Sequence, residues 1–357
     1  MIGVDTHKHV HVAAARDLLG RRLDQASFGT DAASLRELLA WAEELGPIRA
    51  FGIECTGSFG RGLVQLLRDT GYTVWEINQP NKAARRRRGK NDWVDADAAA
   101  MAVLSGTVDI VPKTADGTAE MIRTLQVARR GAVKASTDCM NTIKSLVVTA
   151  PTELRDELAG LGPKGLIDAC LNLDFGPLNS PGAATEFALR RLAVRYQALQ
   201  AEMAAFTEEI TALVQQTAPD LLDRLGFGPE TLGALLVAVG DNPGRLRSEG
   251  AFANLCGVAP IEASSGKTSR HRLNRGGDRS ANAALHRVIL VRIGQKHPPT
   301  MAYFHRRIAE GKSKREAIRC LKRYLAREVY QVLKTLPLTA PPLPEPPARH
   351  LTLLPTR

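Results

Sequence analysis

Four acidic residues in the N-terminal part of the chain have the types and spacing of a divalent-metal site. Asp5 follows the apolar run "MIGV", Glu54 follows "AFGI", and Asp92 and Asp95 are three residues apart. Residues at that spacing share one face of a helix. Clustered carboxylates repel each other and bind hard cations, so Mg²⁺ is expected, with Mn²⁺ as the alternative. Two such ions beside a phosphodiester would stabilise its attacking and leaving oxygens. Any one of these acids, taken alone, is more simply a helix cap or a solvated charge.

The segments around these acids predict an α/β domain of the RNase H-like type. Strands are expected over residues 2–5, 9–15, 21–28, 49–54 and 72–77, and helices over 33–45, 59–69 and 92–104, with Asp92 as the N-cap of the last helix. This order is a three-strand meander followed by alternating strands and helices. In such a fold the first and fourth strands are neighbours and the last helix crosses their ends, so the four acids should meet. A nucleotide-binding ATPase fold also opens this way, but "ECTGSFG" lacks the lysine of a phosphate loop.

A second candidate for chemistry is the serine pair in "EASSGKTSRHR". A serine hydroxyl is a weak nucleophile that needs an activating base, and Glu262 and His271 are the nearest candidates. Gly266 would let the backbone approach DNA closely. The cations expected to hold phosphates are Lys267, Arg270, Arg272, Arg275 and Arg279. An ordinary polar turn is the alternative.

Other basic residues point to a polyanionic partner. The formal net charge is +11 and the pI is about 9.7. Nucleic-acid contacts are expected from Lys8 and from the run that contains Arg85, Arg86, Arg87, Arg88 and Lys90, because these lie close to the acids. The cations between Arg306 and Arg327 fit a nucleic-acid contact or a merely solvated helix.

The remainder of the chain is predicted to be mainly helical. Residues 118–158 are expected to be helical with an interruption at Pro151, residues 159–184 to be loop, and residues 279–333 to be helices. Apolar residues from Leu189 to Leu213 alternate at spacings of three and four, which predicts a coiled coil either within the chain or between chains. The sequence "GFGPETLGALL" resembles a helix–hairpin–helix turn. The predicted domains are 1–150 (catalytic), 151–217 (helical coiled coil), 218–335 (C-terminal, with the serine) and 336–357 (disordered, proline-rich).

Several classes of protein are disfavoured by the same sequence. The five cysteines form no CxxC pair, which argues against a zinc site or a disulfide framework and favours a reducing cytoplasm. Neither a signal peptide nor an apolar run of membrane-spanning length is expected, so no membrane partner is predicted.

Taken together, the motifs resemble the DEDD insertion-sequence transposases, which are relatives of the Piv DNA invertase. The N-terminal motifs are "GVDTHK", "ECTGSFG" and "KNDWVDADAAA", and the C-terminal ones are "GFGPETLGALLVAVGD", "FANLCGVAP" and "SSGKTSRHRLNRGGDRSANAAL". The similarity extends from the N-terminus to about residue 335. The chain departs from the family pattern at Asn91, at "LGFG" and at Ser264.

The resemblance implies an RNA-guided DNA recombinase whose N-terminal domain is RuvC-like. Family members pair a structured bridge RNA with target and donor DNA, act as homotetramers (dimers of dimers), and hold Mg²⁺ on carboxylates that correspond to Asp5, Glu54, Asp92 and Asp95. It also implies that Ser265 attacks DNA to form a covalent phosphoserine, at a composite site completed by another protomer. Two other hypotheses are a metal-dependent nuclease that hydrolyses junction DNA and a non-catalytic nucleic-acid-binding protein.

Overall fold

The computed structural model describes residues 1–77, 91–108, 110–266 and 271–336, and the chain divides into two compact units. The first unit contains residues 1–117 and 239–248, and the second contains residues 118–238 and 249–338. This division does not follow the predicted boundary at residue 150, because the helix that begins at Thr118 packs within the second unit. The assignment of functional domains stays a prediction. In the described ranges no helix combines the length and apolarity of a membrane span.

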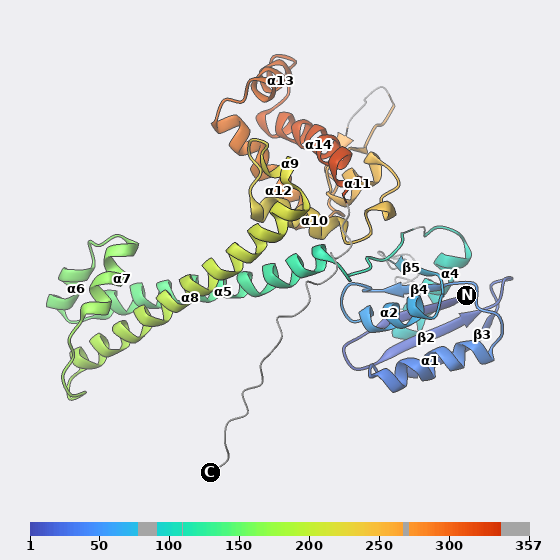
Figure 1. Ribbon diagram of the computed structural model, residues 1–357, viewed down its shortest axis with the longest axis horizontal. Helices are drawn as coiled ribbons and strands as arrows, with labels where there is room; N and C mark the ends of the chain where they lie inside the picture. Colours follow the sequence, from blue (N-terminus) through green and yellow to red (C-terminus); the bar gives the residue numbers. More distant parts are fainter. Residues whose placement is uncertain (78–90, 109, 267–270, 337–357) are drawn as a thin grey trace, which may run out of the picture. The chain divides into compact units, whose positions relative to one another are not determined.

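The first unit is built on a five-stranded mixed sheet (Figure 1). Its strands are β1 (Ile2–Thr6), β2 (His11–Arg16), β3 (Arg22–Phe28), β4 (Phe51–Glu54) and β5 (Val74–Ile77), in the order β3-β2-β1-β4-β5. β1 pairs antiparallel with β2 and parallel with β4, and β4 pairs parallel with β5. This mixed α/β arrangement is consistent with the predicted RNase H-like class, although several elements begin one or two residues later than expected.

Alternate residues of the strands point to opposite faces of the sheet, and each face packs against different helices. Ile2, Val4, Phe51 and Ile53 form one core with α1 (Ala32–Glu44) and α2 (Arg61–Asp69). The other face is covered by α4 (Asp92–Leu104), whose alanines pack on β1, β2 and β4. The sheet is therefore the middle layer of a three-layer unit.

Helix α4 lies unusually close to the sheet because glycines occupy the strand positions beneath it. A Cβ on Gly3 of β1 would lie 2.1 Å from the carbonyl oxygen of Ala96 and 2.2 Å from the amide nitrogen of Ala100. A Cβ on Gly52 of β4 would lie 2.5 Å from a methyl group of Val103. A backbone-to-backbone approach of this kind is open only to glycine.

The N-cap of α4 differs from the prediction by one residue. Asn91, not Asp92, has the extended cap conformation, and its side-chain oxygen accepts a hydrogen bond of 3.0 Å from the amide of Trp93. Asn and Asp are comparable caps, so the sequence alone did not distinguish them. The consequence is that the carboxylate of Asp92 is not occupied in capping.

The second unit contains two long helices, α5 (Thr118–Thr149) and α8 (Pro181–Thr217), packed side by side (Figure 1). The predicted seam on α8 contacts α5 of the same chain: Leu189 is buried with Cys139, Ile143 and Val147 of α5, and the seam residues Leu192, Tyr196 and Leu199 pack against this core. Ala193, which is outside the predicted spacing, is buried there as well. Farther along, the side-chain amide of Gln200 donates to the hydroxyl of Ser136 at 2.9 Å. The structure therefore shows the heptad pattern as an intramolecular pairing.

The predicted loop over residues 159–184 is partly wrong. The chain forms α6 (Thr152–Leu158) after Pro151, then α7 (Pro163–Asn172), and α8 already begins at Pro181. Two of the three prolines in this segment, Pro163 and Pro181, stand at first helical positions, where proline is tolerated. Leu166, Ile167 and Cys170 of α7 are buried in the core with α5 and α8.

The rest of the second unit is a helical bundle with a short hairpin. Its elements are α9 (Pro219–Leu222), α10 (Pro229–Val239), α11 (Glu249–Leu255), β6 (Ile261–Glu262), β7 (His271–Arg272), α12 (Arg279–Gly294), α13 (Pro298–Ala309) and α14 (Lys314–Leu333); a 3₁₀ turn, η1 (Pro243–Arg245), lies in the part of the chain that belongs to the first unit. Because α9 is a single turn, the predicted helix–hairpin–helix is reduced to one short turn before α10. Buried Arg292 ties α12 to α14 through two hydrogen bonds to Glu328, at 3.0 and 3.1 Å.

The close packing of α4 gives a first prediction. Gly3→Ala should lower the free energy of unfolding by about 3 kcal/mol, because the added methyl group overlaps the backbone of α4. The measurement is urea unfolding followed by circular dichroism.

Gly131→Ala is the matched control. Gly131 lies in α5 with nothing within 4 Å of an added Cβ, so this change should raise the free energy of unfolding by about 0.5 to 1 kcal/mol. Equal effects of the two substitutions would contradict the packing described here.

Candidate active site

Asp5 and Glu54 lie at the same edge of the sheet, where neighbouring parallel strands end. Val4 of β1 is in register with Ile53 of β4, so the two acids follow on adjacent strands. The hydroxyl of Thr6 donates to the backbone carbonyl of Glu54 at 2.9 Å and joins the strand ends. Asp5 is only 6% exposed, whereas Glu54 is half-buried.

Helix α4 brings Asp92 and Asp95 to the same edge in its first turn. Asp95 is 3% exposed, while Asp92 is partly exposed. Burial raises the pKa of the Asp5 carboxyl; His7 opposes this effect, and the charges of Asp92 and Asp95 add to it. The carboxyl of Asp5 on β1 therefore lies close enough to Asp92 and Asp95 on α4 to be affected by their charges. The meeting of all four acids, Glu54 included, stays a prediction.

His7 is a member of this cluster that sequence reasoning missed. Its Nε2 lies 3.2 Å from Oδ2 of Asp5 and 3.4 Å from Oδ1 of Asp92. Residues two apart at a strand end share a face, so the pair Asp5–His7 in "GVDTHK" was a usable pattern. A histidine in a hairpin turn is common, and only the position of Asp92 on α4 makes this one notable.

The donor set fits a divalent cation. Ligand atoms of Asp5, His7 and Asp92 all lie within 4.8 Å of one another. A cation would relieve the repulsion between the carboxylates, and oxygen donors of this kind suit Mg²⁺ or Mn²⁺. Imidazole is a less usual ligand for these ions, so a bound cation either displaces His7 or takes it as an additional ligand. The roles of all four acids stay predictions.

Asp97, on the same helix, has a different task. Its carboxylate pairs with Arg16, at 2.5 Å, and with Arg22, at 3.3 Å. Burial alone would raise the pKa of Asp97, but hydrogen bonds from Arg16 and Arg22 hold it below its ordinary value. Asp97 therefore anchors α4 to β2 and β3, whereas Asp92 and Asp95 interact with Asp5 at the strand ends.

The serine loop of the second unit, residues 257–277, is closed at its base by two glycines. A Cβ on Gly277 would lie 2.1 Å from the amide nitrogen of Gly257, so the two ends of the loop touch through their backbones. Asn282 of α12 holds this base with hydrogen bonds to the carbonyls of Cys256, at 2.8 Å, and Gly257, at 3.2 Å. The loop therefore projects from a fixed stem.

Ser264 and Ser265 are both exposed, and Ser265 precedes Gly266, whose φ of +54° lies in the left-handed region. β6 pairs with β7 so that Glu262 stands opposite His271. The two residues considered as bases for the serine are thus neighbours across the hairpin stem.

The predicted phosphate-binding residues are only partly within the described structure. Lys8, Arg272, Arg275 and Arg279 are exposed. Arg85, Arg86, Arg87, Arg88, Lys90, Lys267 and Arg270 lie outside the described residues. Lys8 follows His7 in the turn between β1 and β2, on the first unit, and the three arginines are in the second.

Metal binding can be tested by comparing two acids of the first unit. Asp5→Asn should abolish the rise in Tm that Mg²⁺ or Mn²⁺ produces. Without metal it should raise Tm, because it removes a buried carboxylate that Asp92 and Asp95 repel. The measurement is thermal unfolding with and without each ion.

Asp97→Asn is the control. It should cost about 3 kcal/mol of stability, because Arg16 is left without its buried partner, yet the response to metal should persist. A normal metal response in Asp5→Asn would rule out Asp5 as a ligand.

Comparison with known proteins places both regions in one family. A DEDD transposase model, described as "Transposase", matches residues 2–150 and so contains the four acids. A model described as "Transposase IS116/IS110/IS902 family" matches residues 220–306 and contains Ser265. No curated protein matches the chain. The two matches cover separate regions of the chain, and both models describe transposases of this group. This protein therefore belongs to the IS110 family of transposases.

Proposed function

We propose that this transposase cuts and rejoins DNA through a covalent bond to Ser265, with Asp5, Glu54, Asp92 and Asp95 holding Mg²⁺ at the reacting phosphodiester. Membership of the family makes the chain an enzyme of DNA transposition. The observation that carries the finer proposal is the exposed serine before a left-handed glycine, in a chain that also has a carboxylate cluster at strand ends.

The chemistry of the serine step conserves the number of phosphodiester bonds. The Ser265 oxygen bonds to phosphorus as its proton leaves to a base, and one DNA oxygen leaves as a hydroxyl group. Glu262 and His271 are the candidate bases of the loop. Attack of a DNA hydroxyl on the phosphoserine then restores Ser265 and a DNA phosphodiester. Mg²⁺, when bound, would polarise the phosphodiester and stabilise the charge on its oxygens.

The partners we propose are target and donor DNA and a structured guide RNA. The net charge of +11 supports a polyanionic partner, and exposed Arg272, Arg275 and Arg279 supply cations at and after the serine loop. RNA guidance and assembly into a tetramer are properties that the resemblance implies.

The serine assignment is tested by a covalent adduct. Protein, guide RNA, target and donor duplexes and Mg²⁺ should give a protein–DNA species that resists denaturant. Ser265→Ala should reduce it by at least about a thousandfold, as expected for loss of a nucleophile.

Ser264→Ala is the matched control, because it removes the adjacent exposed hydroxyl. Adduct formation should persist in this variant. The opposite result would move the nucleophile to Ser264, and free cut ends without adduct in the wild type would favour the metal-dependent nuclease.

Guidance is tested separately by leaving out the RNA. Without it the wild-type protein should still bind DNA through its positive charge, with strong dependence on salt, but should form no adduct at a defined site. Sequence-specific adducts in the absence of RNA would refute guidance without affecting the serine assignment.

A further inference from the structure

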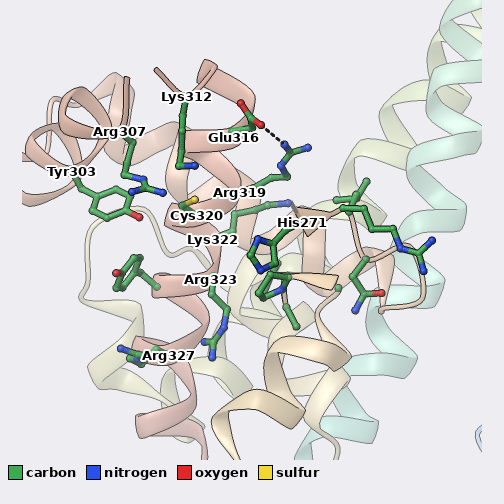
Figure 2. Close-up of a pocket in the computed structure, with 18 residues that line it drawn as sticks. His271, Tyr303, Arg307, Lys312, Glu316, Arg319, Cys320, Lys322, Arg323 and Arg327 are labelled. Atoms are coloured by element: carbon green, nitrogen blue, oxygen red, sulfur yellow. Dashed lines mark ion pairs between the residues drawn. The ribbon is translucent and has the colours of Figure 1, made fainter. Parts of the chain in front are cut away.

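A cavity of about 430 Å³ lies in the second unit, between the stem of the serine loop and helices α13 and α14 (Figure 2). We call it the stem pocket. From the loop side it is lined by residues 257–260 and 271–274, which flank the serine hairpin. Its volume is that of a pocket for one small ligand or nucleotide, and it is too small for a duplex.

The stem pocket is strongly basic. Its lining includes the seven cations Arg272, Arg307, Lys312, Arg319, Lys322, Arg323 and Arg327, and the only carboxylate among the lining residues is Glu316. Several cations are paired: Arg319 with Glu316 at 3.6 Å, Arg307 with Glu310, and both Arg323 and Arg327 with Glu249. Within the described part of the chain, Arg272, Lys312 and Lys322 form no ion pair. The pocket therefore has positive charge in excess of its own acids.

Lys322 is the most informative of these residues because it is buried. It is 7% exposed, and its amino group donates a hydrogen bond of 2.8 Å to the side-chain oxygen of Asn282, a neutral partner. Burial lowers the pKa of Lys322, and the charge of Arg319 lowers it further. A buried cation without a counter-charge is costly, and an anion bound in the pocket would offset that cost.

Lys322 is also connected to the serine loop. Asn282, which accepts its hydrogen bond, is the residue that donates to the carbonyls of Cys256 and Gly257 at the loop base. Figure 2 shows Lys322 and His271 on adjoining walls of the pocket. An anion at Lys322 would therefore lie beside the stem from which Ser265 projects.

The pocket also has an aromatic surface. Tyr324 lines it, is 52% exposed, and forms an edge-to-face pair with Tyr303, with ring centroids 5.0 Å apart. Exposed aromatic rings beside cations are the usual combination for single-stranded nucleic acid, where bases stack on the rings and phosphates pair with the cations.

We propose that the stem pocket binds one nucleotide of a single strand, with its phosphate at Lys322, Lys312 and Arg272 and its base against Tyr324. This inference rests on the proposed function in one respect: if Ser265 attacks DNA, a DNA strand bound in the pocket would be the strand presented to Ser265. The recognised chemistry is a phosphodiester with an unstacked base, whether from the DNA strand or from the guide RNA.

The test measures binding and not cleavage. Full-length Ser265→Ala protein is titrated into fluorescently labelled single-stranded DNA and, separately, RNA of the same sequence, and affinity is followed by anisotropy at several salt concentrations. Lys322→Gln and Lys312→Gln should each weaken binding on the order of tenfold, as for loss of one charged hydrogen bond. Each should also reduce the slope of log K against log salt by about 0.7.

Arg315→Gln is the matched control, because Arg315 is an exposed cation of α14 that does not line the pocket. It should leave affinity nearly unchanged. If the pocket variants lose affinity for single-stranded DNA, the pocket binds the strand presented to Ser265. If they lose affinity for RNA, the pocket binds the guide RNA. Pocket variants that behave like Arg315→Gln on both strands overturn the proposal, whatever the adduct assay shows.

Cys320 gives a second readout that does not depend on folding of the Lys322 variant. It lines the pocket, while Cys139, Cys170 and Cys256 are buried, so in a Cys55→Ser background it is the accessible thiol. A saturating single-stranded oligonucleotide should slow its alkylation several-fold. Unchanged alkylation at saturation would place the strand elsewhere and contradict the proposal.

Discussion

The close approach of α4 to the sheet is the constraint on which the candidate active site depends. Gly3 and Gly52 leave no side chain between the strands and the helix backbone, and the alanines of α4 fill the remaining space. The first turn of the helix therefore lies near the ends of β1 and β4, where Asp5 and Glu54 stand. A larger residue at either glycine would lift the helix and move Asp92 and Asp95 away from the strand ends, where the metal site is proposed.

Electrostatic roles on α4 are divided by helix face. Asp97 is neutralised by Arg16 and Arg22, which fixes the helix to β2 and β3. Asp92 and Asp95 face Asp5, and their charges help raise its pKa. The structural ion pair thus anchors the helix whose first turn carries the mutually repelling carboxylates of the proposed metal site. Such a balance is expected where a protein keeps a strained set of charges for binding.

The serine loop is organised by the same kind of backbone contact. Gly257 and Gly277 touch at its base, and Asn282 bridges this base to Lys322 on α14. The loop is long, but its stem accepts hydrogen bonds from Asn282 of α12, which in turn accepts one from Lys322 of α14. The basic stem pocket lies beside this stem, and this position is the basis for the strand-binding site proposed above.

The sequence by itself determined the order of the elements in the first unit, the bounds of the helix at residues 92–104 and the position of four acids at element ends. These features are local: apolar alternation, helix periodicity and the residue that ends a strand. Only the tertiary structure decided that Asn91 and not Asp92 caps α4, that residues 163–172 form a helix, and that the seam on α8 packs on α5. It also decided the positions of His7 and Lys322, because their surroundings are made by residues distant in sequence.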